Sequence, residues 1–300
     1  MIRLPALAVD WLDAAAGRLL RAPGMPSPDF AAPVGEPALA PADGVSWRVF
    51  HNPVTLFIGG VTAVLLELAE PRVRAGVWEH TSFRADPLRR LQRTGLAAMV
   101  TVYGARSVAG QMIAGVGRMH QRVAGRTPEG TPYRADEPEL LDWVQATAAF
   151  GFVEACHRWV RPLSDAEKDR AYAEGAPAAA LYGATGAPRS LAEQRALFDR
   201  MKPKLEPSPV IGEFLDIMHR TPILPGASRL AQGMLLRAAV DTLPDWAIDL
   251  LHLRDRGLRA WEAPVVRLAG ATADGLVLPS SPPVQACRRL GLPDDWLARR

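Results

Sequence analysis

Apolar residues along this chain recur at intervals of three and four positions, which is the spacing of one face of an α-helix. No run alternates between apolar and polar residues over the length of a strand. The most apolar stretch extends from Pro53 to Ala69, and we interpret it as a buried central helix. Glu70 and Pro71 should end this helix, because proline has no amide hydrogen to donate and clashes with the preceding turn. The pattern predicts an all-α fold.

Two helices are predicted on either side of Gly104. The first should begin at Asp86 and Pro87 and run to Tyr103, since an acid caps the free amides of a first turn and proline suits the first helical position. The second is expected over Arg106–Val123. Its core stripe is predicted to be the apolar residues at helical spacing, Val108, Met112, Val116, Met119 and Val123.

His120 lies in the second of these helices, about 70° from the centre of that stripe and beside Ala109 and Ile113. The same helix contains three glycines, Gly110, Gly115 and Gly117. Each glycine costs a helix about 1 kcal/mol relative to alanine. We therefore expect the glycines to allow the close approach of a neighbouring helix or of a flat ligand.

The remainder of the body is also predicted to be helical. Further helices are expected over Asp136–Val160, Glu167–Tyr182, Ser190–Lys202, Val210–His219 and Ala227–Leu243. Asp136 with Glu139, and Ser190 with Glu193, have the spacing of helix-start signals in which side chains satisfy free amides. The stretch Gly125–Arg134 is predicted to be a loop because it contains two prolines and a second glycine.

We expect a single domain with a flank on each side. Residues 1–45 are predicted to contain a short helix over Trp11–Leu20 and a proline-rich arm, and residues 46–254 to form the all-α body. Residues 255–300, rich in proline and glycine, are expected to pack on that body as a C-terminal extension.

Composition narrows the class of protein. With 48% hydrophobic and 22% charged residues, the chain is typical of a soluble globular protein. The net charge of +3 comes from arginines dispersed among acids, a pattern that argues against nucleic-acid binding. The two cysteines, Cys156 and Cys287, form neither a disulfide framework nor a thiolate metal motif. Asp10 and Asp13 interrupt the first apolar residues, so we expect no signal peptide, a cytoplasmic location and at most peripheral membrane contact.

Candidate chemistry gathers around His120 and the helix before it. Arg90, Arg93 and Thr94 share one face of that helix because they are three and four residues apart. Guanidinium groups bind carboxylates, so this face suits haem propionates, an acidic substrate or an acidic neighbouring helix. One imidazole is enough to hold a haem iron. The residues alone leave two plain alternatives open, a core histidine and a solvated basic face.

Two other motifs give no support for a metal site or a dinucleotide site. Glu154 and His157 have the E-x-x-H spacing of helix-bundle di-metal sites, but such a site needs a second pair, so we interpret them as a surface pair. The G-V-G at Gly115–Gly117 follows no strand and lacks a third glycine, which excludes a dinucleotide fingerprint.

Three stretches together resemble a known family. They are G-G-V-T-A-V-L-L-E-L-A-E-P-R-V-R-A-G-V-W-E-H-T-S-F-R-A-D-P-L-R-R-L-Q-R-T, then M-H-Q-R-V-A-G with Y-R-A-D-E-P-E-L-L-D-W-V-Q-A-T, and P-L-S-D-A-E-K-D-R. Over about Trp47 to Leu253 the chain is similar to the rubber oxygenase (latex clearing protein) catalytic domain and the fungal mycophenolic-acid-pathway oxygenase. The resemblance implies a globin-like helical bundle of about eight or more helices that binds haem b and cleaves carbon–carbon double bonds with dioxygen.

The resemblance also implies roles for single residues. His120 matches the family's axial iron ligand, while Arg90 and Thr94 match an arginine and a threonine of the haem environment. With these, Gly117 and Gln145 are expected to border the haem. Arg93 stands where rubber-cleaving members have a lysine.

Three positions depart from the family pattern. Besides Arg93, Gln145 replaces the histidine of a W-V-H-A-T string, and Ala124 stands where an arginine commonly follows the axial histidine. Arginine does not release a proton as lysine can.

The leading hypothesis is a haem b-dependent oxygenase that acts with dioxygen on a small apolar, unsaturated substrate. Arg90, Arg93 and Thr94 are its candidate catalytic residues, and His120 is its candidate metal ligand. The departures keep two alternatives open: an all-α protein that binds haem or a lipid-like ligand without turnover, and a structural member of the family without cofactor. The oligomeric state is left open.

Overall fold

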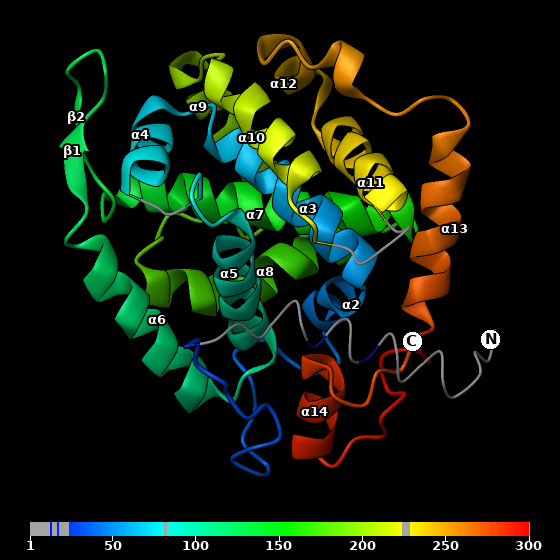
Figure 1. Cartoon of the computed structure of the whole chain (residues 1–300). Coiled ribbons are helices and arrows are strands. Elements are labelled where there is room, and N and C mark those ends of the chain that lie inside the picture. Colours follow the sequence, from blue (N-terminus) through cyan, green and yellow to red (C-terminus); the bar gives the residue numbers. More distant parts are fainter. Residues whose placement is uncertain (1–12, 14–16, 18–23, 81–82, 224–228, 300) are drawn as a thin grey trace.

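The computed structural model describes residues 13, 17, 24–80, 83–223 and 229–299. Its described part is all-α apart from one small hairpin (Figure 1). The helices are α2 (Val45–His51), α3 (Pro53–Glu67), α4 (Pro71–His80), α5 (Pro87–Tyr103), α6 (Arg106–His120), α7 (Pro138–Trp159), α8 (Asp165–Tyr182), α9 (Leu191–Met201), α10 (Pro209–Arg220), α11 (Arg229–Thr242), α12 (Asp245–Leu250), α13 (Glu262–Asp274) and α14 (Pro282–Arg289). The hairpin pairs β1 (Ala124–Arg126) with β2 (Pro132–Arg134), and short 3-10 turns lie at Lys202–Lys204 and Arg254–Arg256.

Helix α3 is the centre of the molecule, as its apolar sequence predicts. It crosses α7 at two glycines, and the close approach depends on both. A Cβ added to Gly151 would lie 2.3 Å from the Gly59 carbonyl oxygen, and one added to Gly59 would lie 2.8 Å from the Gly151 carbonyl oxygen. The largest apolar cluster surrounds this crossing and includes the fully buried Trp143 and Trp159. Helix α11 covers another side of α3, where Thr62 donates to the Ala239 carbonyl at 3.0 Å.

The chain turns sharply between α2 and α3. Asn52 caps α3 by accepting from the Val54 and Thr55 amides, and its own amide nitrogen donates to the Gly270 carbonyl in α13 at 2.8 Å.

Within the described residues no single helix is long and apolar enough to cross a membrane. Helices α2 and α3 meet that test only when joined, and they are bent by 97° at the break.

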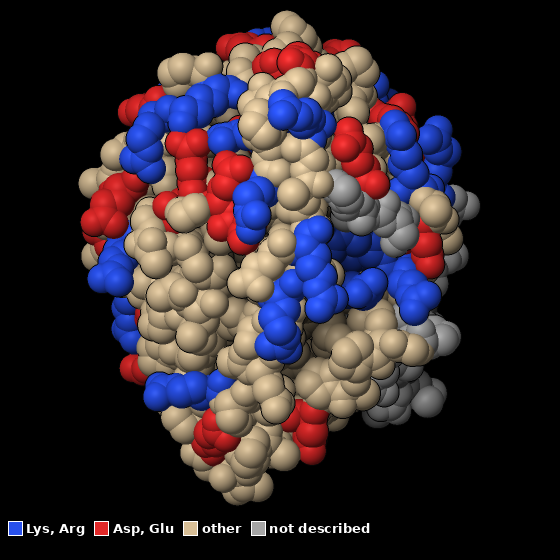
Figure 2. Space-filling model, turned by 90° about the vertical axis from the view of Figure 1, so that its left-hand side faces the viewer, with Lys and Arg blue, Asp and Glu red and all other residues tan. Residues whose placement is uncertain are grey.

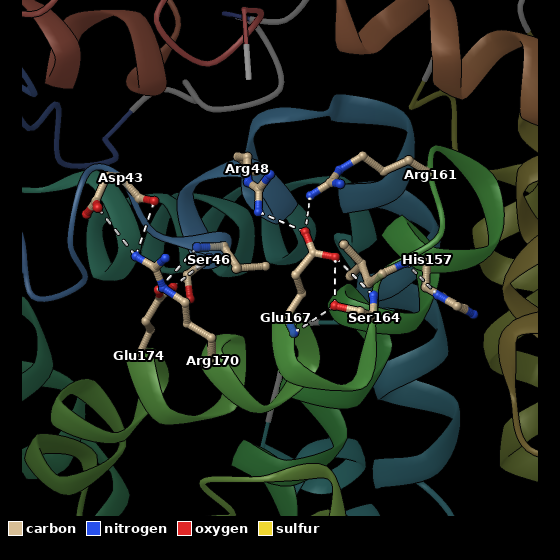
Figure 3. A network of polar contacts seen from close by, with 11 residues as sticks. Asp43, Ser46, Arg48, His157, Arg161, Ser164, Glu167, Arg170 and Glu174 are labelled. Carbon is tan, nitrogen blue, oxygen red and sulfur yellow. Dashed lines mark hydrogen bonds and ion pairs between the residues drawn. The ribbon is translucent and has the colours of Figure 1, made fainter.

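A polar network fixes α2 against α8 (Figure 3). The Glu174 carboxylate accepts from the Val45 and Ser46 amides at the start of α2. In the first turn of α8, Glu167 forms a capping box with Ser164 and also binds Arg48 and Arg161. These bonds, led by the one from the Ser164 amide, lower the pKa of Glu167 to about 2. The network therefore holds α2 and α8 together.

Sequence patterns predicted most helices. Helix α5 has its predicted ends, and Ser190 caps α9 by accepting from the Glu193 amide. The helix predicted over Trp11–Leu20 lies largely outside the described residues, and the start of the one predicted from Ala227 lies there too.

Some local predictions were wrong. Helix α3 ends at Glu67, before Pro71, and Pro71 instead opens α4, because its missing amide is harmless in a first turn. The predicted loop Gly125–Arg134 contains the hairpin, in which Gly125 pairs with Tyr133. Asp136 caps no helix, since it binds Arg134 instead, and α7 begins after Glu137 without a side-chain cap.

Candidate functional site

His120 is the last residue of α6 and lies on that helix's buried face. The buried residues of α6 are Ala109 and Ile113, which share a face with His120. The predicted core stripe was wrong: Val108, Met112 and Val116 are half-buried, and Met119 is 49% exposed. The true inward face is rotated toward the histidine.

The surroundings of the His120 imidazole favour its neutral form. Partial burial lowers its pKa, the nearby Arg90 lowers it further, and Asp136 acts in the opposite direction. No hydrogen bond joins the ring to another residue of the described chain. A neutral imidazole with a free nitrogen is the form that binds metals.

Arg90 lies close to His120, and its charge acts on this histidine. It is half-buried on α5, and its guanidinium donates to the Thr94 hydroxyl at 2.9 Å. The Thr94 hydroxyl in turn donates to the Arg90 carbonyl at 3.0 Å, so this threonine orients the arginine from an exposed position. Burial lowers the pKa of Arg90, Glu67 acts in the opposite direction, and the charge of the exposed Arg93 lowers it further.

Glu67 joins this group, and the sequence analysis missed it. It ends α3, beside Arg90 and the Thr147 hydroxyl of α7. Burial raises its pKa to about 7, although Arg90 and Thr147 act to lower it. A carboxyl group in an apolar run offers no sequence signal, because only the fold brings Arg90 to it.

The cluster of His120, Arg90 and Glu67 adjoins a face of α3 that is not fully covered. Phe57, Gly60, Val64 and Glu67 lie at helical spacing on this face and are only half-buried, although α3 is the central helix. The face is mainly apolar, with Glu67 and the nearby Arg90 at one end.

The remaining predicted residues are less closely tied to this group. Gly117 is half-buried on α6, and a Cβ added to it would have no described neighbour within 4 Å. The same holds for Gly110, so the predicted close approach of another helix to these two glycines is wrong. Gln145 is half-buried on α7, and Ala124 is exposed in β1.

Basic side chains gather on the surface beside these helices. Figure 2 faces the side that carries the hairpin and α6, and shows Lys and Arg side chains next to a hollow at the level of α5. A basic rim suits a ligand that carries carboxylates.

The E-x-x-H pair has structural roles. Glu154 binds the buried Lys168 at 2.7 Å, and the His157 Nδ1 accepts from the Leu163 amide at 2.9 Å. Across the described residues no three His, Cys, Asp or Glu side chains gather to hold a metal ion. A haem, which carries its own four nitrogen ligands, needs only one such side chain.

A family model described as "ER-bound oxygenase mpaB/B'/Rubber oxygenase, catalytic domain" matches residues 47–275. The match contains His120, Arg90, Glu67 and the helices that carry them, and it extends 21 residues beyond 254, the predicted end of the body. The chain matches no curated protein and no solved structure.

Proposed function

Because the chain belongs to this family of oxygenase catalytic domains, we propose that it is a haem b-dependent oxygenase acting with dioxygen on an apolar, unsaturated substrate. The observation that carries the proposal is the His120 imidazole, which lies on the inward face of α6 without a hydrogen-bond partner in the described chain. It lies near a half-buried cation, Arg90, which together with burial lowers its pKa.

The residues present fit a haem. His120 would bind its iron, Arg90 would bind a propionate or line the space for dioxygen, and the open space beside Gly117 would leave room for the group. When bound, the haem supplies the iron that activates dioxygen.

The protein's own residues would bind the substrate along α3. The half-buried apolar face of this helix, with Phe57 and Val64, would hold an apolar substrate and exclude water. Glu67, whose pKa is about 7, can accept or release a proton at its carboxylate oxygen near neutral pH. Arg90 stabilises the ionised form of that carboxyl group.

A second candidate is a haem- or lipid-binding member without turnover. It is favoured by two positions where the family pattern has a group that can transfer a proton. Arg93 and Gln145 cannot transfer protons as lysine and histidine do. Glu67 offers a way to distinguish the candidates, because proton transfer at its carboxylate would serve an oxygenase and would have no role in a carrier.

Absorption spectroscopy tests the proposal. The purified protein, mixed with haemin, should show a Soret band that His120→Ala removes or shifts. His219→Ala, which alters an exposed histidine of α10, is the matched control and should leave the spectrum unchanged. A wild-type protein that binds no haem would refute both candidates.

Oxygen uptake separates the two candidates. With ferrous haem and a short polyisoprene, the oxygenase should consume oxygen and release carbonyl products, and Glu67→Gln should slow turnover while keeping the Soret band. If the protein binds haem but consumes no oxygen with any unsaturated chain, the second candidate, a binding protein without turnover, is supported.

A further inference from the structure

Helix α13 has apolar residues on two faces. Its inner face packs on the core through the buried Val266, Gly270 and Ala273. Gly270 is required there, since a Cβ would lie 2.4 Å from the Trp159 carbonyl oxygen. A helix with one buried face normally presents polar residues on the other.

The outer face is apolar instead. Trp261, just before the helix, is 59% exposed, Val265 is 41% exposed and Leu268 is 67% exposed. Spacings of four and three residues place them in one line along the helix. They are three of the six large hydrophobic side chains exposed in the described part of the chain, and the other three lie on separate elements. This line of side chains is called the outer stripe below.

The exposed charges of the segment that carries the outer stripe have one sign. Arg259 and Arg267 are both exposed there, and Arg267 lies over the Trp159 ring, 5.7 Å from its centre. The one acid between residues 257 and 273 is Glu262, which is 1% exposed and paired with Arg237. The stripe therefore has a basic border without an exposed acid in that segment.

The position of α13 lets the stripe make contact with a broad surface. Helix α13 stands at the outer edge of the molecule, with α11 and α3 on its inner side (Figure 1). We propose that the outer stripe lies on an anionic lipid bilayer. Val265 and Leu268 enter the boundary between headgroups and acyl chains, Trp261 lies at headgroup level, and Arg259 and Arg267 bind lipid phosphates.

This occupant fits better than a protein partner for two reasons. The stripe lies on a projecting helix rather than in a groove, so it suits a deformable surface. Its tryptophan and arginines are the residue types that anchor helices at membrane interfaces. The proposal does not depend on haem or on turnover.

Vesicle flotation with the full chain tests the proposal. The protein should float with vesicles of phosphatidylcholine and phosphatidylserine, and at least about tenfold less with phosphatidylcholine alone, since each arginine near an anionic surface adds attraction. Trp261→Ser with Leu268→Ser should lower binding by about tenfold or more, because the apolar contact is lost. Arg259→Gln should weaken binding to the anionic vesicles only.

The matched control replaces exposed apolar residues elsewhere. Val34→Ser with Leu181→Ser removes side chains of similar exposure from the N-terminal arm and from α8, and should leave flotation unchanged. Thermal melting of both double variants checks that each is folded. Equal flotation of the stripe variant and wild type, or no flotation of wild type, would overturn the proposal. Light scattering that shows a wild-type dimer lost in the stripe variant, without flotation, would assign the stripe to a second copy of the chain.

Discussion

The chemical properties of Glu67 depend on the residues that the fold places around it. In the sequence it is one acid in an apolar run, and nothing marks it as functional. In the structure it meets Arg90 and Thr147, and burial raises its pKa. His120 and Arg90 could be predicted as candidates because their residue types and spacing suit the chemistry. Glu67 could not, because its role depends on three helices that meet only in the fold.

The raised pKa of Glu67 predicts how stability depends on pH. The folded protein keeps the Glu67 proton up to about pH 7, whereas the unfolded chain releases it near the ordinary value of 4.5. Stability from this group is therefore full below pH 4.5 and is lost as pH rises to 7. Glu67→Gln should match wild type in free energy of unfolding near pH 4.5. At pH 8 it should exceed wild type by up to about 3 kcal/mol.

Urea unfolding of the haem-free protein at both pH values measures this difference. Comparing the two proteins cancels the titration of the other groups. A constant difference between pH 4.5 and pH 8 would show that the carboxyl group ionises normally in the folded state.

At the scale of the elements, prediction succeeded where the signal is local. Asp86 and Pro87 start α5, and Ser190 with Glu193 starts α9, since a cap depends on residues a few positions apart. It failed where a segment depends on distant partners. The hairpin is covered by α4, and Tyr133 is buried there, so a stretch that reads as a loop becomes paired strands.

The crossing of α3 and α7 yields a prediction about glycines. Gly59→Ala and Gly151→Ala would each force a Cβ into the backbone of the opposite helix. We expect a loss of about 3 kcal/mol or more for each, since a tightly packed crossing must separate. Gly110→Ala on α6 is the matched control, because an added Cβ meets no described atom within 4 Å.

The control should raise stability by up to about 1 kcal/mol, because alanine favours a helix over glycine. Thermal melting and urea unfolding of the three variants measure the contrast. A mild effect of Gly151→Ala would mean that the two helices cross less closely than described.

At the scale of the whole molecule, the chain beyond the family match completes a second core. Helix α14 buries Ala286 and Cys287 against Trp47, Met99 and Tyr103. Arg289, 1% exposed, donates to the Phe30 and Glu36 carbonyls. The arm before α2 is thus held in place by the end of the chain.

Replacing Arg289 should loosen this arm. Arg289→Leu leaves the buried Phe30 carbonyl and the partly buried Glu36 carbonyl without this donor, and we expect a loss of about 2–3 kcal/mol. Chymotrypsin should then cut near Phe30 faster than in wild type. Arg288→Leu removes an exposed ion pair with Asp294 and an exposed hydrogen bond to the Pro279 carbonyl; it is the matched control and should cost below about 1 kcal/mol. Equal cleavage rates in the two variants would show that the arm is held elsewhere.

The bond from Asn52 to Gly270 sets a limit on how the C-terminal third of the chain can vary in length. It joins the start of α3 to one carbonyl of α13. At this position only glycine fits, because a Cβ on residue 270 would clash with the Trp159 carbonyl oxygen. One residue inserted between Gly257 and Glu262 would move a different side chain against Trp159 and shift the carbonyl by about 1.5 Å. Length changes should therefore be tolerated after Asp274, in the turns before α14, and rejected between Gly257 and Gly270.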